Sequence, residues 1–170
     1  MNPISEITVV SPTEIEVEGQ RYACRIGRGG VAADKREGDL KTPVGRFPLR
    51  VCFYRPDRLD PPETGLKTIA LTPMDGWCDD PCDPLYNLHV TLPFAASHEK
   101  LWREDPVYDL IIPIGYNDET ITPGKGSAIF MHLMREDGVE TEGCLALKKK
   151  DFLALLPRLS VHTFIRVPAL

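Results

Sequence analysis

Thr141-Glu142-Gly143-Cys144-Leu145-Ala146-Leu147 is the segment from which both the fold and the chemistry of this chain are inferred. It places a cysteine directly after a glycine, which permits a tight turn and a close approach of the backbone to a bound carbonyl group. His132 lies upstream, at the end of an apolar run. A cysteine nucleophile needs a nearby base, because a free thiol with a pKa of ~8.5 is mostly protonated at neutral pH. The pair therefore predicts thiolate catalysis.

The same residues suggest how a reaction would proceed. The backbone N–H of Cys144, and that of Gly143 beside it, are candidates to stabilise a tetrahedral oxyanion. His132 would take the thiol proton and later deliver a proton to a leaving amine. A third group normally orients the imidazole. No Asp or Asn is clearly designated for this role, so a backbone carbonyl is an equally good candidate.

Outside this segment the pattern is that of a mainly β protein with one or two short helices. Alternating or apolar runs predict strands at residues 6–10, 14–18, 21–26, 107–114, 127–133 and 161–167. Asp151 is expected to cap a short helix that Pro157 limits. Residues 99–103 are expected to form a helical turn. Since no linker divides the chain, we expect a single domain over residues 1–170.

Charge and hydropathy exclude several classes of partner. The chain has 170 residues, with 20 Lys and Arg against 25 Asp and Glu, for a net charge of −5. This balance argues against binding to nucleic acid or to an anionic membrane. No apolar stretch approaches the ~18 residues that span a bilayer. The N-terminus lacks the pattern of a signal peptide. We therefore expect a cytoplasmic protein as the chain stands, or a periplasmic or envelope protein if a leader was removed; the oligomeric state stays open.

The cysteines raise the question of a metal site. Cys78 and Cys82, with His89 beyond them, allow a zinc interpretation, but a closed site needs four ligands and no second Cys/His pair stands nearby. No metal is therefore expected. No phosphate-binding glycine motif opens a helix, so no cofactor is expected either. Five cysteines cannot all pair, and reduced thiols are expected, with Cys24 and Cys52 as small buried hydrophobic residues.

Two segments of the chain, an upstream one at residues 38–47 and the later one that holds His132 and Cys144, resemble the catalytic domain of the L,D-transpeptidase (YkuD-like) family. That family carries a histidine, a loop and then [Ser/Thr]-His-Gly-Cys-[Ile/Val]-Arg, and residues 141–146 lie over the second part. Upstream, residues 38–47 resemble its Thr-Pro-x-Gly-x-Phe segment. The resemblance extends over about residues 20–167.

This resemblance implies a β-sandwich-like fold and acyl transfer on peptidoglycan stem peptides through an acyl-thioester on Cys144. The terminal D-alanine would leave, with His132 as proton acceptor and donor. An amine acceptor would give an L,D cross-link, and water would give carboxypeptidase activity. For the substrate cleft the candidates, each with a structural role as its alternative, are Thr141, Glu142, Tyr116, Asn117, Tyr86 and Asn87.

The chain departs from the family pattern at two positions. Glu142 stands in place of the usual histidine, and Ala146 stands in place of the usual arginine. A carboxylate this close should raise the thiol pKa unless it points away or pairs with a cation. Loss of the guanidinium removes an anchor for a carboxylate or backbone group. Transpeptidation is the expected function, with a cytoplasmic L,D-carboxypeptidase or a non-catalytic peptidoglycan-binding module as alternatives.

Overall fold

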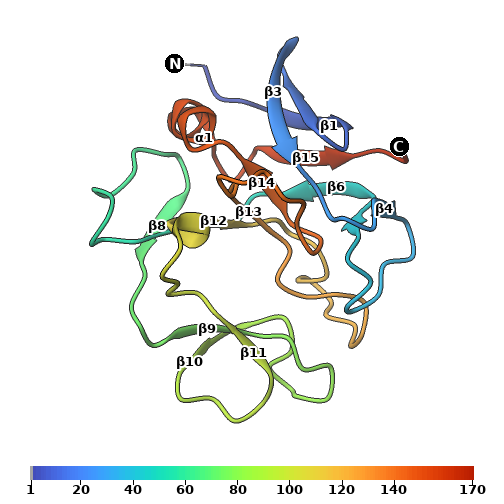
Figure 1. The fold of residues 1–170 in the computed structure, drawn as a ribbon, viewed down its shortest axis with the longest axis vertical. Coiled ribbons are helices and arrows are strands. Elements are labelled where there is room, and N and C mark those ends of the chain that lie inside the picture. The colour runs from blue at the N-terminus through green and yellow to red at the C-terminus, as the bar shows by residue number, and fades with distance from the viewer. Residues whose placement is uncertain (1) are drawn as a thin grey trace.

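The computed structural model describes residues 2–170 and shows a large curled sheet with a smaller sheet at one end of it (Figure 1). Across the large sheet the strands run in the order β6 (Gly45–Pro48), β15 (Phe164–Val167), β1 (Glu6–Ser11), β2 (Glu14–Val17), β3 (Gln20–Arg25), β14 (Leu145–Leu147), β13 (Phe130–Leu133), β12 (Leu110–Pro113), β7 (Val51–Tyr54) and β8 (Lys67–Ala70). We call the smaller sheet, with β9 (Asp75–Cys78) between β10 (His89–Thr91) and β11 (His98–Lys100), the small sheet. A further pair joins β4 (Val31–Ala32) to β5 (Thr42–Pro43).

The burial of the strands follows from their positions. In β2, Ile15 and Val17 are buried while the intervening Glu14 and Glu16 are more exposed, as expected for a strand covered on one face. The adjoining strands β12, β13 and β14 are buried along their whole length. These three strands lie between two apolar clusters, so their side chains alternate between the two. Met131 and Leu145 belong to the larger cluster, whereas Phe130 and Cys144 belong to the other.

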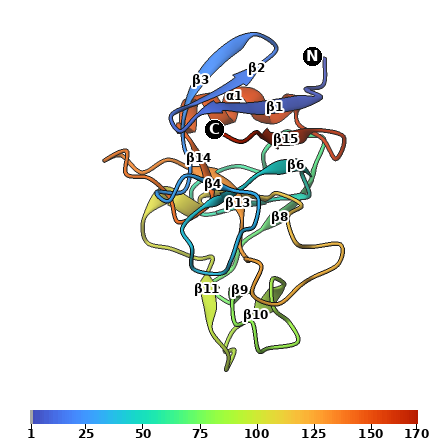
Figure 2. The same ribbon diagram turned by 90° about the vertical axis from the view of Figure 1, so that its right-hand side faces the viewer.

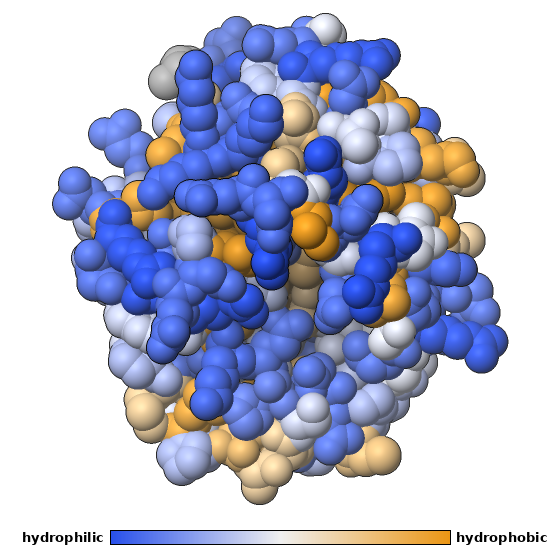
Figure 3. Space-filling view, in the orientation of Figure 1, coloured by the Kyte–Doolittle hydropathy of each residue, from blue (hydrophilic) through white to orange (hydrophobic). Residues whose placement is uncertain are grey.

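The predicted fold class, mainly β and sandwich-like, is confirmed. The three N-terminal strands pair as a meander, with Ile15 opposite Tyr22. Turned by 90°, the molecule shows this meander at one end and the small sheet at the other (Figure 2). The face drawn in Figure 3 is largely hydrophilic, with hydrophobic side chains interspersed. Within residues 2–170, the structure contains no helix with the length and apolar character needed to cross a membrane.

Two helical predictions need correction. Helix α1 (Lys149–Leu155) begins before Asp151, which lies in its first turn, and the capping position is Lys148 without a side-chain bond. Pro157 falls in the following 3₁₀ turn, η2 (Leu156–Arg158). Residues 99–103 are not a helical turn, because Glu99 pairs with Trp77 as part of β11.

The strand predicted at 107–114 is shorter than expected. A 3₁₀ turn, η1 (Pro106–Tyr108), precedes it, and the Asp105 side chain accepts a hydrogen bond from the Val107 N–H at its start. β12 itself begins at Leu110. This turn matters for the site because it brings the ring of Tyr108 against that of His132, at 5.4 Å between ring centroids.

Candidate active site

Strand pairing brings Cys144 and His132 into one cavity. β13 and β14 run parallel, with His132 opposite Ala146. Cys144 precedes β14 by one residue, so its side chain shares a face with those of Ala146 and His132. The backbone N–H of Phe130 donates a hydrogen bond to Cys144 Sγ at 3.3 Å. A cavity of about 1080 Å³ is lined by both Cys144 and His132.

The turn before Cys144 is built around Gly143. This residue has φ of +134°, and a Cβ there would lie 2.9 Å from the carbonyl oxygen of Lys41. The hydroxyl of Thr141 accepts from the Gly143 N–H at 3.1 Å and donates to the Cys144 carbonyl at 2.6 Å. Thr42 donates to the Gly143 carbonyl at 2.9 Å. The Gly143 N–H is therefore already engaged, and of the two predicted oxyanion donors the Cys144 N–H is the stronger candidate.

Those contacts also explain why two distant motifs occur together. Thr42 belongs to the upstream Thr-Pro-x-Gly-x-Phe segment, and its hydroxyl also accepts from the backbone N–H of Gly27 at 2.9 Å. The upstream segment is thus a support for the cysteine turn. Thr141 is buried beneath the turn, where its hydroxyl has two backbone partners, and it also borders the cavity.

The resting thiol of Cys144 is neutral. Burial raises its pKa to about 12, and the negative charge of Glu99 acts in the same direction. The Phe130 N–H opposes these effects, because a donor stabilises the thiolate. In this state the thiol donates to the carbonyl oxygen of Ala128 at 3.2 Å. Ala128 has φ of +53°, an unusual conformation for a residue with a Cβ.

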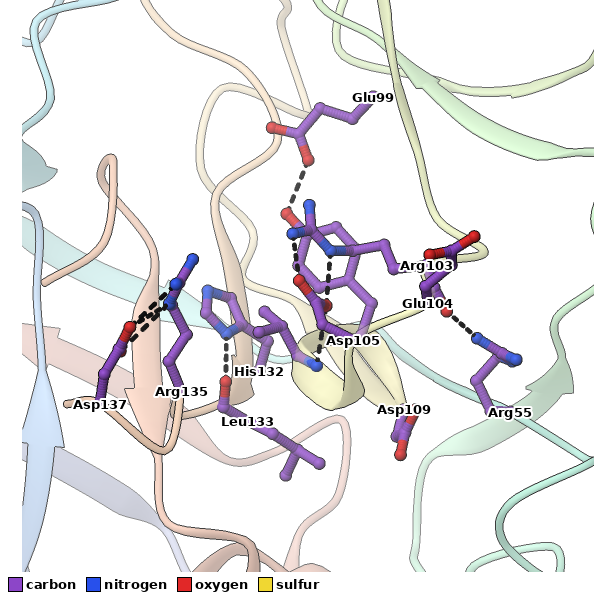
Figure 4. Close-up of polar contacts among 12 residues, drawn as sticks. Arg55, Glu99, Arg103, Glu104, Asp105, Asp109, His132, Leu133, Arg135 and Asp137 are labelled. Carbon is purple, nitrogen blue, oxygen red and sulfur yellow. Dashed lines mark hydrogen bonds and ion pairs between the residues drawn. The ribbon is translucent and has the colours of Figure 1, made fainter. Parts of the chain in front are cut away.

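The imidazole of His132 is neutral as well. Burial lowers its pKa to about 4. Nδ1 lies 2.9 Å from the carbonyl oxygen of Leu133 (Figure 4). Because a carbonyl only accepts, Nδ1 carries the proton and Nε2 is left as the acceptor of the ring. The group that orients the imidazole is therefore a backbone carbonyl, one of the alternatives left open by the sequence.

The two departures from the family pattern have different structural consequences. The Glu142 side chain is 77% exposed and lies 3.4 Å from the guanidinium of Arg28, so it sits at the rim and pairs with a cation. Its charge raises the thiol pKa less than that of Glu99 does. Ala146 is buried opposite His132 and borders the cavity. A methyl group at this position leaves space where the usual arginine would extend.

Four of the predicted cleft residues lie outside the lining of this cavity. Tyr86 donates to Glu37 and accepts from the Gly126 N–H at 3.0 Å. Asn117 bonds the carbonyl oxygens of Thr122 and Gly126. These side chains hold the loop at 115–126 together, as does Tyr116, whose hydroxyl donates to the carbonyl of Lys125.

Asn87 is the fourth of these residues and connects several segments. Its Nδ2 donates to the carbonyls of Tyr116 at 3.2 Å and Asn117 at 2.8 Å. Its Oδ1 accepts from Trp77 Nε1 and from the Ala128 N–H, both at 3.0 Å. Asn87 thus positions Ala128, whose carbonyl accepts a hydrogen bond from the thiol of Cys144.

Several polar residues in the cavity were not identified from sequence. Tyr108 donates to Glu99 at 2.6 Å, and the guanidinium of Arg103 pairs with Asp105 at 2.6 and 2.8 Å (Figure 4). Asp79 also borders the cavity. No local motif marks these residues. Glu99 and Asp79 come from the small sheet and its edge, which packs beside β13 with Trp77 edge-on to Phe130 at 5.1 Å, whereas Arg103, Asp105 and Tyr108 follow β11 and lead into η1.

Cys78 and Cys82, considered above as zinc ligands, lie in different environments. Cys78 is buried and Cys82 is exposed. His89 pairs with Asp75 at 2.7 Å. In the part of the chain that the structure describes, no three His, Cys, Asp or Glu side chains are arranged to hold a metal ion. Cys24 and Cys52 are buried, as expected, and burial raises the pKa of each to about 12.

Comparison with known proteins agrees with this geometry. The family model for the L,D-transpeptidase catalytic domain (YkuD) matches residues 7–167. The chain therefore belongs to this family, a class of enzymes that act on peptidoglycan. Searches of curated proteins and of solved structures returned no match.

Proposed function

We propose that the chain is a cysteine-dependent L,D-transpeptidase in which Cys144 forms an acyl-thioester with a peptidoglycan stem peptide. The observation that carries this proposal is the shared cavity, in which Cys144 Sγ accepts from the Phe130 N–H while His132 Nε2 makes no hydrogen bond within residues 2–170. The side chains alone offer a nucleophile and a base. The backbone contacts hold each of them in a defined orientation, which chemistry at an amide carbonyl requires.

The first half-reaction begins from a neutral pair. The raised thiol pKa and the lowered imidazole pKa favour the uncharged forms, so proton transfer accompanies attack instead of preceding it. As sulfur attacks the amide carbon, the Sγ–H bond of Cys144 breaks and its proton leaves the hydrogen bond with the Ala128 carbonyl and passes to His132 Nε2. The developing oxyanion is stabilised by backbone donors such as the Cys144 N–H. His132 then protonates the leaving amine, and D-alanine departs as the thioester forms.

The second half-reaction decides between transfer and hydrolysis. His132 Nε2 takes a proton from the attacking amine or water, the tetrahedral intermediate collapses, and the thiol is regenerated with that proton. A cavity of about 1080 Å³ is larger than most sites for a single small ligand. Its size supports an amine acceptor bound beside the acylated peptide, and hence transfer over the alternative carboxypeptidase reaction.

The test is product analysis with a defined disaccharide-tetrapeptide, by mass spectrometry, with and without an amine acceptor. Wild type should release D-alanine and form a conjugate with the acceptor. Cys144→Ala should abolish both products, while Cys82→Ser, which removes the exposed thiol, should retain them. D-alanine release by Cys144→Ala at the wild-type rate would refute the proposal, and release without conjugate would identify a carboxypeptidase.

The alternative of a non-catalytic binding module requires a sharper assay than thiol labelling. A nucleophilic cysteine with a lowered pKa would alkylate faster than the other four at neutral pH. Burial instead raises the pKa of Cys144 to about 12, as it does for Cys24 and Cys52. Slow labelling of the empty protein is therefore expected for an enzyme as well. Detection of the acyl-thioester on Cys144 by intact-protein mass spectrometry discriminates the two functions.

A further inference from the structure

A second cavity adjoins the contact between Trp77 and Phe130. It has a volume of about 330 Å³ and is bordered by side chains from β7, β9, β10, β12 and β13. Trp77 and Phe130 border this second cavity but not the catalytic one, and the reverse holds for Cys144 and His132. Among residues 2–170 the two cavities share one bordering residue, Ile129. The second cavity is therefore a separate space beside the catalytic one.

Aromatic rings make up much of the surface of the second cavity. Phe53, Trp77 and Phe130 all border it. The imidazole of His89, which also borders it, stacks on the ring of Phe53 at 5.6 Å between centroids and lies inclined to that of Trp77 at 6.4 Å. Aromatic rings stabilise one another in stacked or edge-on arrangements beyond the effect of the area that they bury. This surface therefore favours a ring over an aliphatic chain of the same size.

The polar side chains at the border of the second cavity already have partners within the chain. The guanidinium of Arg50 makes two hydrogen bonds to Asp118, at 2.7 and 3.0 Å, so these two opposite charges offset each other. His89 Nε2 lies 2.7 Å from a carboxylate oxygen of Asp75. Both ends of the Asn87 amide are engaged. A charged ligand would lose its hydration here without gaining a partner, so the cavity disfavours it.

We propose that the second cavity is a binding site for a small, uncharged aromatic molecule. The aromatic class follows from the rings that border the cavity, and the lack of charge follows from the paired polar groups. The volume of about 330 Å³ lies at the lower end of the range for small-molecule sites, which limits the ligand to one or two fused rings. A ligand of about ten non-hydrogen atoms should bind with a dissociation constant on the order of 0.1 mM. This site is independent of the proposed function.

The two tryptophans of the chain allow the site to be tested by NMR. Trp77 borders the second cavity and Trp102 borders the catalytic cavity, so each indole N–H reports on one of them. The ¹⁵N-labelled protein is titrated with 2-naphthol, and the two indole signals are assigned with Trp102→Phe. The Trp77 signal should shift along a saturable curve with a dissociation constant on the order of 0.1 mM, while the Trp102 signal stays in place.

Two analogues of 2-naphthol test the class of ligand. The saturated decahydro-2-naphthol keeps the hydroxyl group and the two fused rings but lacks aromatic faces, and it should bind about threefold more weakly or worse. The anion 2-naphthoate keeps the aromatic rings and adds a charge, and it should bind about tenfold more weakly or worse. Equal affinity for all three compounds would show that the cavity takes up apolar matter without selecting an uncharged aromatic ring, and would overturn the proposal.

Substitutions at the border of the second cavity locate the ligand. Val51, half-buried in β7, borders the cavity, and Val51→Phe should fill part of it and weaken 2-naphthol binding about tenfold. Val161→Phe makes the same change at a 53% exposed position outside both cavities and should leave binding unaltered. Leu88→Ala, at a 39% exposed position on the border, should weaken binding about threefold with little risk to the fold.

Three results would refute the site. The Trp77 signal would stay in place at about 2 mM 2-naphthol, well above the expected dissociation constant. The Trp102 signal would move instead, which would place the ligand in the catalytic cavity. Binding would be unchanged in both Val51→Phe and Leu88→Ala, which would place the ligand elsewhere on the protein. The titration uses neither Cys144 nor a peptide, so loss of D-alanine release with the Trp77 response intact would refute only the proposed function.

Discussion

The two sheets that border the cavity contribute in different ways. The large sheet supplies Cys144 and His132, whose hydrogen-bond partners are backbone groups of Ala128, Phe130 and Leu133. The small sheet supplies carboxylates whose surroundings are other side chains. Backbone partners depend on strand register and cannot be removed by a single side-chain replacement, whereas side-chain charges can. The reaction geometry should therefore be sensitive to the backbone of the large sheet, and ligand preference to the side chains of the small sheet.

The largest effect is expected from Gly143→Ala, which tests the backbone half of this comparison. The new Cβ would lie 2.9 Å from the Lys41 carbonyl, at a φ that disfavours any side chain. The turn must shift, and a displacement of about 1 Å at the nucleophile costs roughly 100-fold in rate. We expect that loss in D-alanine release, measured with saturating tetrapeptide.

Gly19→Ala is the matched control for this substitution. Gly19 also has positive φ, +83°, but a Cβ there would meet no atom within 4 Å. It should lower the free energy of unfolding by about 1 kcal/mol through backbone strain and leave the rate of D-alanine release unchanged. Equal activity of the two variants would show that the turn tolerates displacement and would break the comparison.

A smaller effect is expected in the pH dependence of stability, through His132. Its pKa is about 4 in the folded protein, below the ordinary value of 6.5. The fold therefore favours the neutral ring, and the resulting stability is fully present above pH 6.5 and is lost as pH falls toward 4. The loss between pH 7 and pH 4 is about 3 kcal/mol.

Urea unfolding of wild type and His132→Gln at both pH values measures this contribution. The decrease in the free energy of unfolding on acidification should be about 3 kcal/mol smaller in the variant, whatever its stability at pH 7. Equal decreases would mean that His132 titrates in the folded state as it does in water, and that the large sheet does not keep its base neutral.

The sequence predicted the contribution of the large sheet better than that of the small sheet. The strands of the meander and the Gly-Cys turn carry local patterns, and the family and fold class inferred from them are confirmed. The assignment of Cys144 and His132 as catalytic residues stays a prediction, although the structure places both in one cavity. Asp79 and Glu99 could not have been found, because β9 and β11 have only four and three residues, too few to show a strand pattern in the sequence.

The loop residues Tyr86, Asn87, Tyr116 and Asn117, which the sequence offered for the cleft with a structural role as the alternative, lie outside the cavity lining. Tyr and Asn in loops are typical of ligand sites, and sequence alone does not show whether their polar groups have partners in the chain. Here the side chains of Tyr86, Asn87 and Asn117 are satisfied by backbone groups and by the side chains of Glu37 and Trp77. Their role is to hold the segment that leads into β13.

Asn87→Asp examines that supporting role, with an expected effect of about 2 kcal/mol. The substitution keeps the shape of the side chain but replaces the two donors to Tyr116 and Asn117 with a carboxylate oxygen. Thermal or urea unfolding should show the loss. Asn2→Asp, the same change at an exposed position, should leave stability almost unaltered. A stable Asn87→Asp protein would mean that Ala128 holds its position without this residue.

The smallest effect is expected from Glu142→Gln, although this residue is the nearest carboxylate to Cys144 in sequence. Glu142 is exposed and paired with Arg28, where solvent screens its charge, and it raises the thiol pKa less than Glu99 does. Removing the charge should speed alkylation of Cys144 by iodoacetamide less than about threefold. Glu99→Gln, which removes a buried charge with a larger influence on the same thiol, should accelerate it more. The reverse order would show that the rim, and not the small sheet, sets the electrostatics of the cavity.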